Sequence, residues 1–489
     1  MTAPADVVPM GQRFSQLAAE RPDGPALTSV SPTGQERTVS WQQLDTESTQ
    51  LARVLQARGL GAGERLALEL QNSVELVLSV VAAWKLGAVP VPMRWDLPDW
   101  ERARLLDVVA PKLTIRADDL QSLTAAREAE SAEPLPVVVG PQVNGICSSG
   151  STGIPKVILS DRPAVWTPEQ STPFAELWGP VPRPQTILVP APMYHTNGFA
   201  TLFSLLGGDR LIVLAKFDAE LVVDLVERHR VTNFTATPTM LQRIARVPGI
   251  DDRDLSSIAW ILQGAAVIPP ALVHRWIELL DPTRIVMAYG MTEALGLTAL
   301  RGDEWLAHPG SVGRGFRGTE IRIVGEDGQL LPPGEIGEIY LRSPTTGLYT
   351  YLGGAPLLPT TDDGFGTAGD LGHLDEDGYL YIADRRVDMI ITGGANVFPA
   401  EVESALSDHP AIADVVVIGL SDPEWGRRVH AVVEPADPAA PPSPDDVIAY
   451  AKSRLAAYKV PKTVELVERI PRSAATKVSR STLVAEREG

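Results

Sequence analysis

A single cysteine, Cys147, occurs among the 489 residues, which excludes a disulfide within the chain. Lysine and arginine form no run, and the formal net charge is −18, so no basic surface is indicated that would neutralise nucleic-acid phosphates. The longest apolar stretch, residues 74–93, contains Glu75, Lys85 and two prolines, which excludes a membrane span. The N-terminus lacks the basic and apolar regions of a signal peptide. We expect a cytoplasmic protein with no nucleic-acid partner and no membrane span.

The N-terminal half alternates short apolar runs with helical patterns. Strands are predicted at residues 65–70, 186–189, 210–214 and 284–287. Helices are predicted at residues 73–86, 219–229 and 270–280. Strands that alternate with helices are typical of layered α/β sheets, which is the fold class expected here.

The pattern changes near residue 310. Short strands at residues 320–324, 337–341 and 378–382 predict a small antiparallel β unit. After residue 385 a new α+β pattern begins, with a helix at 399–406, a strand at 415–418 and a helix at 444–455. We predict an N-terminal domain of residues 1–384 and a smaller C-terminal domain of residues 389–489, joined at 385–388.

Residues 148–156, Ser-Ser-Gly-Ser-Thr-Gly-Ile-Pro-Lys, indicate a phosphate-binding loop. Glycine lets backbone N–H groups approach an anion, and the hydroxyls add donors without adding charge. The spacing differs from the GxxxxGK[ST] pattern of P-loop enzymes. A flexible Ser/Gly surface loop is the alternative reading of this stretch. Cys147 precedes the loop on an apolar run, which favours a buried strand residue over a nucleophile.

Two further segments follow predicted strands, the place where α/β folds bind ligands. Residues 289–293 read Tyr-Gly-Met-Thr-Glu, and Glu293 can hold magnesium by one oxygen or simply favour a helix start. Residues 194–198 contain His195, one of seven histidines that show no metal-binding spacing.

Residues 364–369 match GxGxxG, but turn-like sequence flanks them instead of a strand and a helix. The dinucleotide interpretation is therefore excluded. The carboxylate of Asp370, which follows directly, can accept hydrogen bonds from two ribose hydroxyls. Lys477, near the C-terminus, is a surface lysine when considered alone.

Taken together and in this order, these segments resemble the adenylate-forming superfamily of acyl-CoA synthetases, adenylation domains and luciferases, over residues 12 to 484. The acyl- and aryl-CoA ligases are closest in pattern. The loop at 148–156 is similar to the family's TSGTTGxPKG, with Val157 in place of the usual glycine. Residues 289–293 match YGxTE, and residues 393–403 resemble GGxNIxPxEIE.

The resemblance implies an ATP-dependent ligase that uses Mg²⁺ and coenzyme A. A carboxylate attacks the α-phosphorus of ATP, and the acyl-adenylate then passes its acyl group to the thiol. The implied catalytic residues are Lys477, Glu293, His195 and Thr292, with Glu293 as the magnesium ligand. The implied ATP and AMP contacts are Ser148, Ser149, Gly150, Ser151, Thr152, Lys156, Gly264, Ala265, Ala266, Tyr289, Gly290, Asp370 and Arg385.

The resemblance also implies a mobile C-terminal domain that rotates between the two steps. The hinge position holds Val387 where the family usually has Asp or Lys, followed by Asp388. Because a β-branched residue is stiff, an enzyme that stops at the adenylate is the alternative. A non-catalytic binding member is a further alternative, and a luciferase-like oxygenase shares all of these motifs. The expected coenzyme A contacts are Gly393, Gly394, Trp425 and Lys459.

The predicted acyl pocket is apolar and indicates a hydrophobic, small-molecule monocarboxylic acid. Its expected lining is Tyr194, His195, Phe199, Gly264, Ala265 and Ala294. An amino-acid substrate is disfavoured, because no aspartate near residues 194–198 would pair with its ammonium. Monomer and homodimer both remain open.

Overall fold

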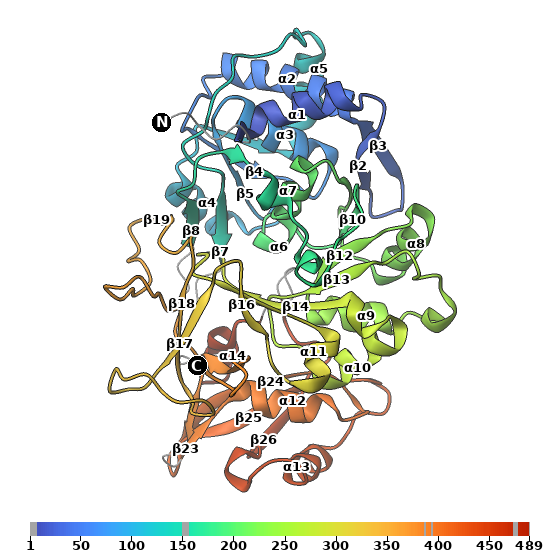
Figure 1. The fold of residues 1–489 in the computed structure, drawn as a ribbon. Helices are drawn as coiled ribbons and strands as arrows, with labels where there is room; N and C mark the ends of the chain where they lie inside the picture. The colour runs from blue at the N-terminus through green and yellow to red at the C-terminus, as the bar shows by residue number, and fades with distance from the viewer. Residues whose placement is uncertain (1–6, 149–155, 386–387, 393–394, 473–477, 489) are drawn as a thin grey trace.

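A computed structural model describes residues 7–148, 156–385, 388–392, 395–472 and 478–488. The chain forms a large N-terminal part and a smaller C-terminal part that lies below it in Figure 1. No helix within these residues is both long enough and apolar enough to cross a membrane.

A nine-stranded sheet forms the centre of the N-terminal part, in the order β16-β15-β14-β13-β12-β10-β11-β2-β3. The run from β14 to β2 is parallel, and antiparallel strands β3, β15 and β16 complete its two sides. The parallel strands are β2 (Pro25–Val30), β10 (Thr186–Val189), β11 (Arg210–Leu214), β12 (Asn233–Ala236), β13 (Trp260–Gln263) and β14 (Ile285–Gly290). The antiparallel ones are β3 (Glu36–Ser40), β15 (Leu297–Arg301) and β16 (Arg314–Phe316).

Helices cover both faces of this sheet, because alternate residues of a strand point to opposite sides. Leu211 and Val213 of β11 join the core formed with helices α1, α2 and α3, whereas Ile212 and Leu214 pack against α8, α9 and α10. The first set is α1 (Met10–Glu20), α2 (Trp41–Ala57) and α3 (Val74–Lys85), and the second is α8 (Ala219–His229), α9 (Pro238–Ala245) and α10 (Pro270–Leu279). The apolar run of β11 is therefore buried on both faces.

Side chains at the helix starts set several of these boundaries. The Ser73 hydroxyl accepts the Leu76 N–H and begins α3, and Asp218 does the same for α8. Thr237 caps α9 directly after β12 ends. Short helices and strands fill the remaining connections: α4 (Asp99–Val109), α5 (Leu120–Glu128), α6 (Thr196–Phe199), α7 (Thr201–Leu206), α11 (Gly302–Ala307), β1 (Val8–Pro9) and β9 (Val165–Trp166).

Besides the two-stranded pair of β1 and β9, three smaller sheets are found in the described residues of the N-terminal part. One is parallel, with β4 (Arg65–Glu69) between β5 (Val89–Pro92) and β6 (Leu113–Arg116). The second is antiparallel and places β8 (Lys156–Ser160) between β7 (Gly145–Ser148) and β19 (Tyr349–Leu352). The third is the predicted β unit, β17 (Glu320–Val324), β18 (Gly337–Arg342), β20 (Asp370–Leu374) and β21 (Leu380–Arg385).

The C-terminal part has its own sheet and core. Strands β24 (Ile412–Asp422) and β25 (Gly426–Pro435) form a long hairpin, joined by β22 (Ile390–Thr392), β23 (Ala395–Val397) and the parallel strand β26 (Thr463–Leu466). The helices are α12 (Pro399–Ser407), α13 (Pro444–Lys452) and α14 (Arg480–Glu488). Its core residues all follow position 388 in the chain. The predicted α/β class with a smaller α+β domain is confirmed, while the boundary at 385–388 stays a prediction.

Several predicted boundaries are wrong by a few residues. The strand expected at residues 415–418 spans Ile412–Asp422, and the one expected at 284–287 extends to Gly290. The strand expected from residue 378 begins at Leu380, because Gly378 has a φ of +79° and its N–H closes a turn onto Asp375. The helix expected to reach residue 455 ends at Lys452, where Ser453 is its C-cap. Residues 364–369 lead into strand β20, so the turn expected after them is wrong; the helix that a dinucleotide-binding motif requires does not follow them either.

Candidate active site

The site forms at the carboxyl edge of the central sheet. Strands β10, β12, β13 and β14 are parallel neighbours, so their carboxyl ends lie along one edge (Figure 1). The segments that follow β10, β13 and β14 are residues 190–198, 264–266 and 291–294. Three segments that the sequence singled out separately are therefore brought together by the strand order.

Asn72 fixes the segment that follows β10. It is 5% exposed, its amide nitrogen donates to the Ala191 carbonyl at 2.9 Å, and its amide oxygen accepts the Met193 N–H at 2.8 Å. Gly198 closes the same segment, because a Cβ there would lie 2.3 Å from the Pro192 carbonyl oxygen. The backbone before and after His195 is thus held from both ends.

A hydroxyl pair joins this segment to the one after β14. The Oγ1 atoms of Thr196 and Thr292 lie 2.8 Å apart. This contact places the predicted catalytic residue Thr292 beside the turn that carries His195. The rings of Tyr194 and His195 lie 4.5 Å apart.

Tyr194 is buried, and burial raises the pKa of its hydroxyl to about 12. The guanidinium of Arg94 opposes this shift, so a cation lies near the predicted acyl pocket. That cation is paired, because Arg94 donates to both oxygens of Asp96 at 2.5 and 3.0 Å. Sequence reasoning missed Arg94, since it follows a strand of a different sheet.

The loop at residues 264–266 is constrained. Ala265 has a φ of +75°, a conformation that costs energy for a residue with a side chain. The buried side chain of Gln263 supports the loop by donating to the Ala266 carbonyl at 2.6 Å. A small residue in a left-handed conformation keeps side-chain bulk away from a bound ring, consistent with the adenine contact expected here.

Ala294 is the second such residue, with a φ of +52°. Its carbonyl accepts a hydrogen bond from the Thr345 hydroxyl at 3.0 Å. The neighbouring Leu295 carbonyl accepts from the Thr346 hydroxyl at 2.7 Å. Five non-glycine residues among those described have a positive φ, and these two of the five were predicted to line the site.

Asp370 lies within reach of the same edge. Its carboxylate is 7% exposed and accepts a hydrogen bond from the Tyr289 hydroxyl at 2.6 Å. The register of β20 and β21 pairs Asp370 directly with Arg385. The two predicted ribose contacts are therefore cross-strand neighbours, and Tyr289 connects them to the YGxTE segment.

Glu293 and Lys156 both contact Tyr351. The Tyr351 hydroxyl donates to Glu293 Oε1 at 2.6 Å, and the Lys156 Nζ lies 5.2 Å from the centroid of the Tyr351 ring. No group of three or more His, Cys, Asp and Glu side chains arranged for a metal occurs among the described residues. A single carboxylate suits Mg²⁺, which is commonly held by one or two carboxylates together with substrate phosphates.

The predicted coenzyme A contacts fall on the C-terminal part. Trp425 is 41% exposed in the turn between β24 and β25, and Lys462 Nζ lies 5.0 Å from the centroid of its ring. Lys459 forms an ion pair with Glu401 at 2.6 Å. Lys462 is therefore the lysine that accompanies Trp425, a pairing that the sequence did not predict.

Several predicted site residues cannot be placed. Ser149, Gly150, Ser151, Thr152, Val387, Gly393, Gly394 and Lys477 lie outside the described residues. Ser148 and Arg385 are described through their strand backbone alone. The proposed roles of all these residues stay predictions.

Phe199 packs in the core of the N-terminal part. It is 3% exposed, and its ring meets that of Trp84 edge-on at 6.2 Å. Its contact with an acyl group stays a prediction. Cys147 lies on strand β7, as expected, but it is half-buried rather than buried; desolvation raises the pKa of its thiol to about 12.

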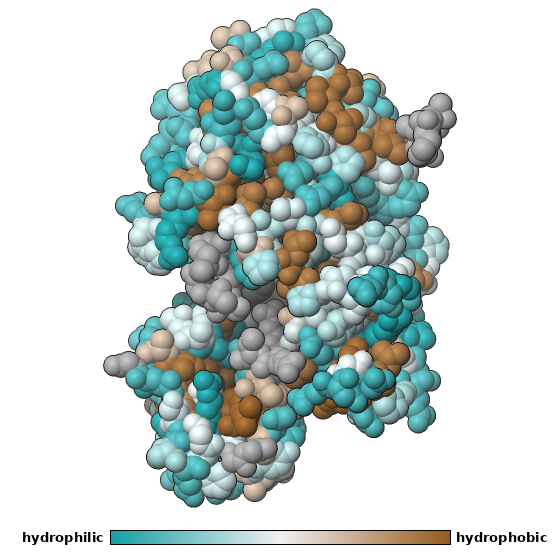
Figure 2. All heavy atoms as spheres, turned by 90° about the vertical axis from the view of Figure 1, so that its left-hand side faces the viewer, coloured by the Kyte–Doolittle hydropathy of each residue, from teal (hydrophilic) through white to brown (hydrophobic). Residues whose placement is uncertain are grey.

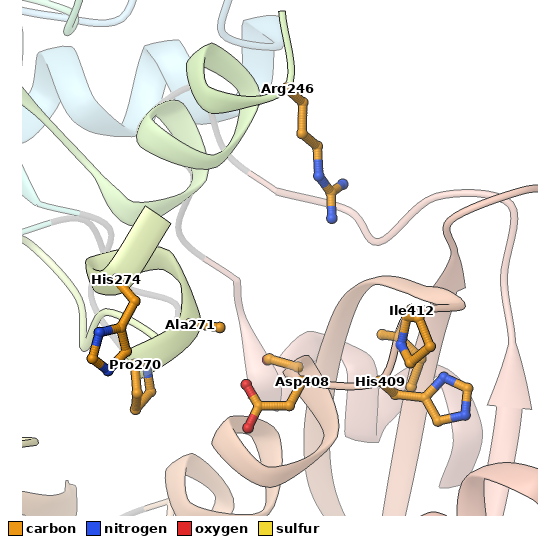
Figure 3. A pocket seen from close by; sticks show the side chains of 9 residues that line it. Arg246, Pro270, Ala271, His274, Asp408, His409 and Ile412 are labelled. Carbon is orange, nitrogen blue, oxygen red and sulfur yellow. The ribbon is translucent and has the colours of Figure 1, made fainter. Parts of the chain in front are cut away.

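A groove separates the two parts of the molecule. Gln242 of α9 donates to the Ala413 carbonyl at 3.2 Å beside it. Figure 3 shows His274 and Arg246 on one side of the groove, facing Asp408 and His409 at the end of α12. Figure 2 views the molecule from the left-hand side of Figure 1, away from α9 and α10, and shows a notch between the larger and the smaller part on that side. None of the predicted site residues lines this groove, whose residues are Arg246, Pro270, Ala271, His274, Ser407, Asp408, His409, Pro410 and Ile412.

The chain matches the family model described as AMP-binding enzyme over residues 14–144 and 143–350, and that of the AMP-binding enzyme C-terminal domain over residues 401–477. A feruloyl-CoA synthase of Amycolatopsis is 34% identical, covering 93% of this chain and 94% of that protein. A long-chain-fatty-acid–CoA ligase of Mycobacterium tuberculosis is 32% identical over the same shares.

The o-succinylbenzoate CoA synthetase of Bacillus subtilis, solved with its acyl-adenylate intermediate, superposes with a TM-score of 0.81 at 28% identity, covering 98% of both chains. The same synthetase has been solved with ATP and a magnesium ion, with a TM-score of 0.80 at 28% identity over 96% of this chain and 98% of that one. These matches confirm the predicted superfamily and the predicted class of enzyme, an AMP-forming acid–thiol ligase, and do not favour the alternatives. The chain belongs to the AMP-binding enzyme family.

Proposed function

We propose that this protein converts a hydrophobic monocarboxylic acid into its coenzyme A thioester at the expense of ATP. In the first step a carboxylate oxygen bonds to the α-phosphorus of ATP, and the bond to the bridging oxygen breaks to release pyrophosphate. In the second step the coenzyme A thiolate attacks the acyl carbonyl, and AMP leaves. The thiol loses its proton to solvent before the attack, and the bond between the acyl carbon and the phosphate oxygen breaks as AMP leaves.

The contact between Tyr289 and Asp370 carries the nucleotide part of this proposal. It holds a buried carboxylate next to the segment after β14, at the edge where Thr196 and Thr292 also meet. A carboxylate there can accept hydrogen bonds from ribose hydroxyls. The α-phosphate would then lie near Thr292, within the same group of loops. Fixing both reactants in one place makes the encounter effectively intramolecular.

The acyl-transfer chemistry requires charge compensation, because an anion must approach a polyanionic nucleotide. Glu293 would hold Mg²⁺, which neutralises phosphate charge when bound. Lys156 and the hydroxyls of residues 148–152 would hold the departing pyrophosphate. Lys477 would bridge the carboxylate and the α-phosphate, and His195 would position the carboxylate.

The acid that we propose as the substrate is hydrophobic and has a single carboxylate, the one that is activated. Tyr194 is buried, and Arg94, a cation that acts on it among the described residues, is already paired with Asp96. The Arg94–Asp96 pair would therefore offer no free positive charge to a second carboxylate on the substrate. Aryl, medium-chain and polycyclic acids all satisfy the proposal.

Coenzyme A would approach the exposed face of Trp425. The indole is 41% exposed, and Lys462 lies over its ring, so a flat base and a phosphate can be bound side by side. Lys459 is paired with Glu401, and it would bind a phosphate of coenzyme A only after that ion pair opens. Rotation of the C-terminal domain about Val387 would bring this surface to the adenylate. Asp388, the next residue, is paired with Arg480 of α14 at 3.1 Å and would move with that domain.

The test is a product assay by mass spectrometry with ATP, Mg²⁺, coenzyme A and a panel of acids: ferulate, indoleacetate, 2-succinylbenzoate, and fatty acids of increasing length. We expect an acyl-CoA from a monocarboxylate of the panel. Lys477→Ala is expected to lower adenylate formation by at least 100-fold, since it removes charge stabilisation from the transition state. Lys452→Ala, which removes an exposed lysine of α13, is the matched control.

The outcomes separate the two half-reactions. Accumulation of acyl-adenylate without thioester would reject the second step and point to Val387. Equal loss in the Lys477 and Lys452 variants would reject the assigned role of Lys477. Turnover of 2-succinylbenzoate alone would overturn the restriction to monocarboxylates.

A further inference from the structure

Tyr351 occupies a central position between two charged residues of the site. It lies on β19, where the antiparallel register pairs it with Ile158 of β8. Lys156 is two residues before Ile158 and so projects from the same face of that strand. The phenol ring is 4% exposed, which fixes its position by packing rather than by solvent contact.

The hydroxyl of Tyr351 forms a hydrogen bond with Glu293. It donates to Oε1 at 2.6 Å, a short bond of the kind expected when the acceptor is ionised. A phenol is protonated at neutral pH, so the Tyr351 hydroxyl is the donor and the Glu293 carboxylate the acceptor of this bond. A carboxylate with one oxygen fixed in this way can rotate little about its side-chain bonds.

The ring of Tyr351 contacts a different residue, Lys156. The Lys156 ammonium lies 5.2 Å from the ring centroid, within the range of a cation–π contact. Lys156 begins the strand that follows the predicted phosphate loop. One side chain therefore contacts both the carboxylate assigned to the metal and the cation assigned to the phosphates, through two different groups.

We propose that Tyr351 is a positioning residue that orients Glu293 for the magnesium ion of the Mg²⁺–nucleotide complex, while its ring holds Lys156 toward the phosphates. Oε1 of Glu293 carries the phenol hydrogen bond, and the other oxygen of the carboxylate is directed to the cation. This assignment rests on the proposed function. Residues that orient a metal ligand from outside commonly account for a 10- to 100-fold change in metal affinity.

Two substitutions separate the hydroxyl from the ring. Tyr351→Phe keeps the ring over Lys156 and removes the bond to Glu293. Tyr351→Leu removes both. Tyr381→Phe is the matched control, because it also removes a phenol bond to a carboxylate: the Tyr381 hydroxyl donates to Asp375 at 3.1 Å, on strand β21 of another sheet.

The measurement is isothermal titration calorimetry with α,β-methylene-ATP, with and without Mg²⁺, which requires no turnover. For Tyr351→Phe we expect a 10- to 100-fold rise in the Mg²⁺ concentration needed for tight nucleotide binding, and unchanged binding without Mg²⁺. Tyr351→Leu should weaken nucleotide binding in both conditions. In the adenylation assay, Tyr351→Phe should regain most of its rate at high Mg²⁺.

The result that overturns the proposal is an equal Mg²⁺ requirement in Tyr351→Phe and Tyr381→Phe. Loss of metal-free binding in Tyr351→Phe would also overturn it, since a general packing defect has that effect. Thermal unfolding of each variant confirms that it is folded. A wild-type protein that binds Mg²⁺–nucleotide but makes no adenylate would reject the proposed function while leaving the role of Tyr351 open to the calorimetric test alone.

Discussion

Removal of the Asn72 side chain should impair both stability and use of the acid. Asn72→Ala leaves the Ala191 carbonyl and the Met193 N–H without the partners they now have. Each buried backbone group left unsatisfied costs about 1–3 kcal/mol, so the free energy of unfolding of the N-terminal part should fall by about 2–6 kcal/mol. Because the freed segment carries Tyr194 and His195, KM for the acid should rise, while KM for ATP changes little.

Urea unfolding and steady-state kinetics measure the two effects separately. Ser73→Ala, at the next position, is the matched control, because it removes the N-cap of α3 at a cost of about 1 kcal/mol and leaves residues 191–193 untouched. It should lower stability without changing KM for the acid. An Asn72→Ala protein that loses stability but keeps the wild-type KM would refute the argument that this side chain fixes the acid-binding segment.

Three further results are expected. Gly198→Ala should abolish activity or folding, because the new Cβ would lie 2.3 Å from the Pro192 oxygen; an active variant would show that the segment can shift. Cys147, with a thiol pKa of about 12, should be about 10⁻⁴ ionised at pH 8 and resist Ellman's reagent until the protein is denatured. Burial lowers the pKa of His430, so its stabilising contribution is present above about pH 6.5 and is lost as the pH falls below that value. Calorimetry should therefore show a steeper loss of melting temperature from pH 7 to 5.5 in the wild type than in His430→Gln.

The strands and helices of the centre were predictable because burial dictates their composition. A strand covered on both faces is a short apolar run, and β10 and β11 match their predicted ranges of residues 186–189 and 210–214. Helix α8, with its polar cap and apolar face, matches residues 219–229. The errors lie at ends, where one turn residue such as Gly378 decides the boundary.

The loops of the site were predictable for a different reason. Glycines and hydroxyls cluster in sequence when they must follow a strand and face a ligand, so Tyr289, Thr292 and Glu293 stand close together in the chain. The residues that hold those loops in place are not close to them in the sequence. Asn72 and Tyr351 belong to a helix start and a strand of other layers, and they meet the site only through the fold. Nothing in their own neighbourhoods distinguishes them from ordinary polar and aromatic positions.

Three of the contacts that organise the site join segments far apart in the chain. Tyr351 and Glu293 are separated by 58 residues, Tyr289 and Asp370 by 81, and Asn72 and Met193 by 121. Each pair connects a loop at the carboxyl edge to a residue of another sheet or layer. The geometry of the loops is therefore a property of the docked layers, and it exists only once these have packed. It follows that a substitution in a supporting layer, such as Tyr351→Phe, can alter metal binding without touching any residue of the linear motifs.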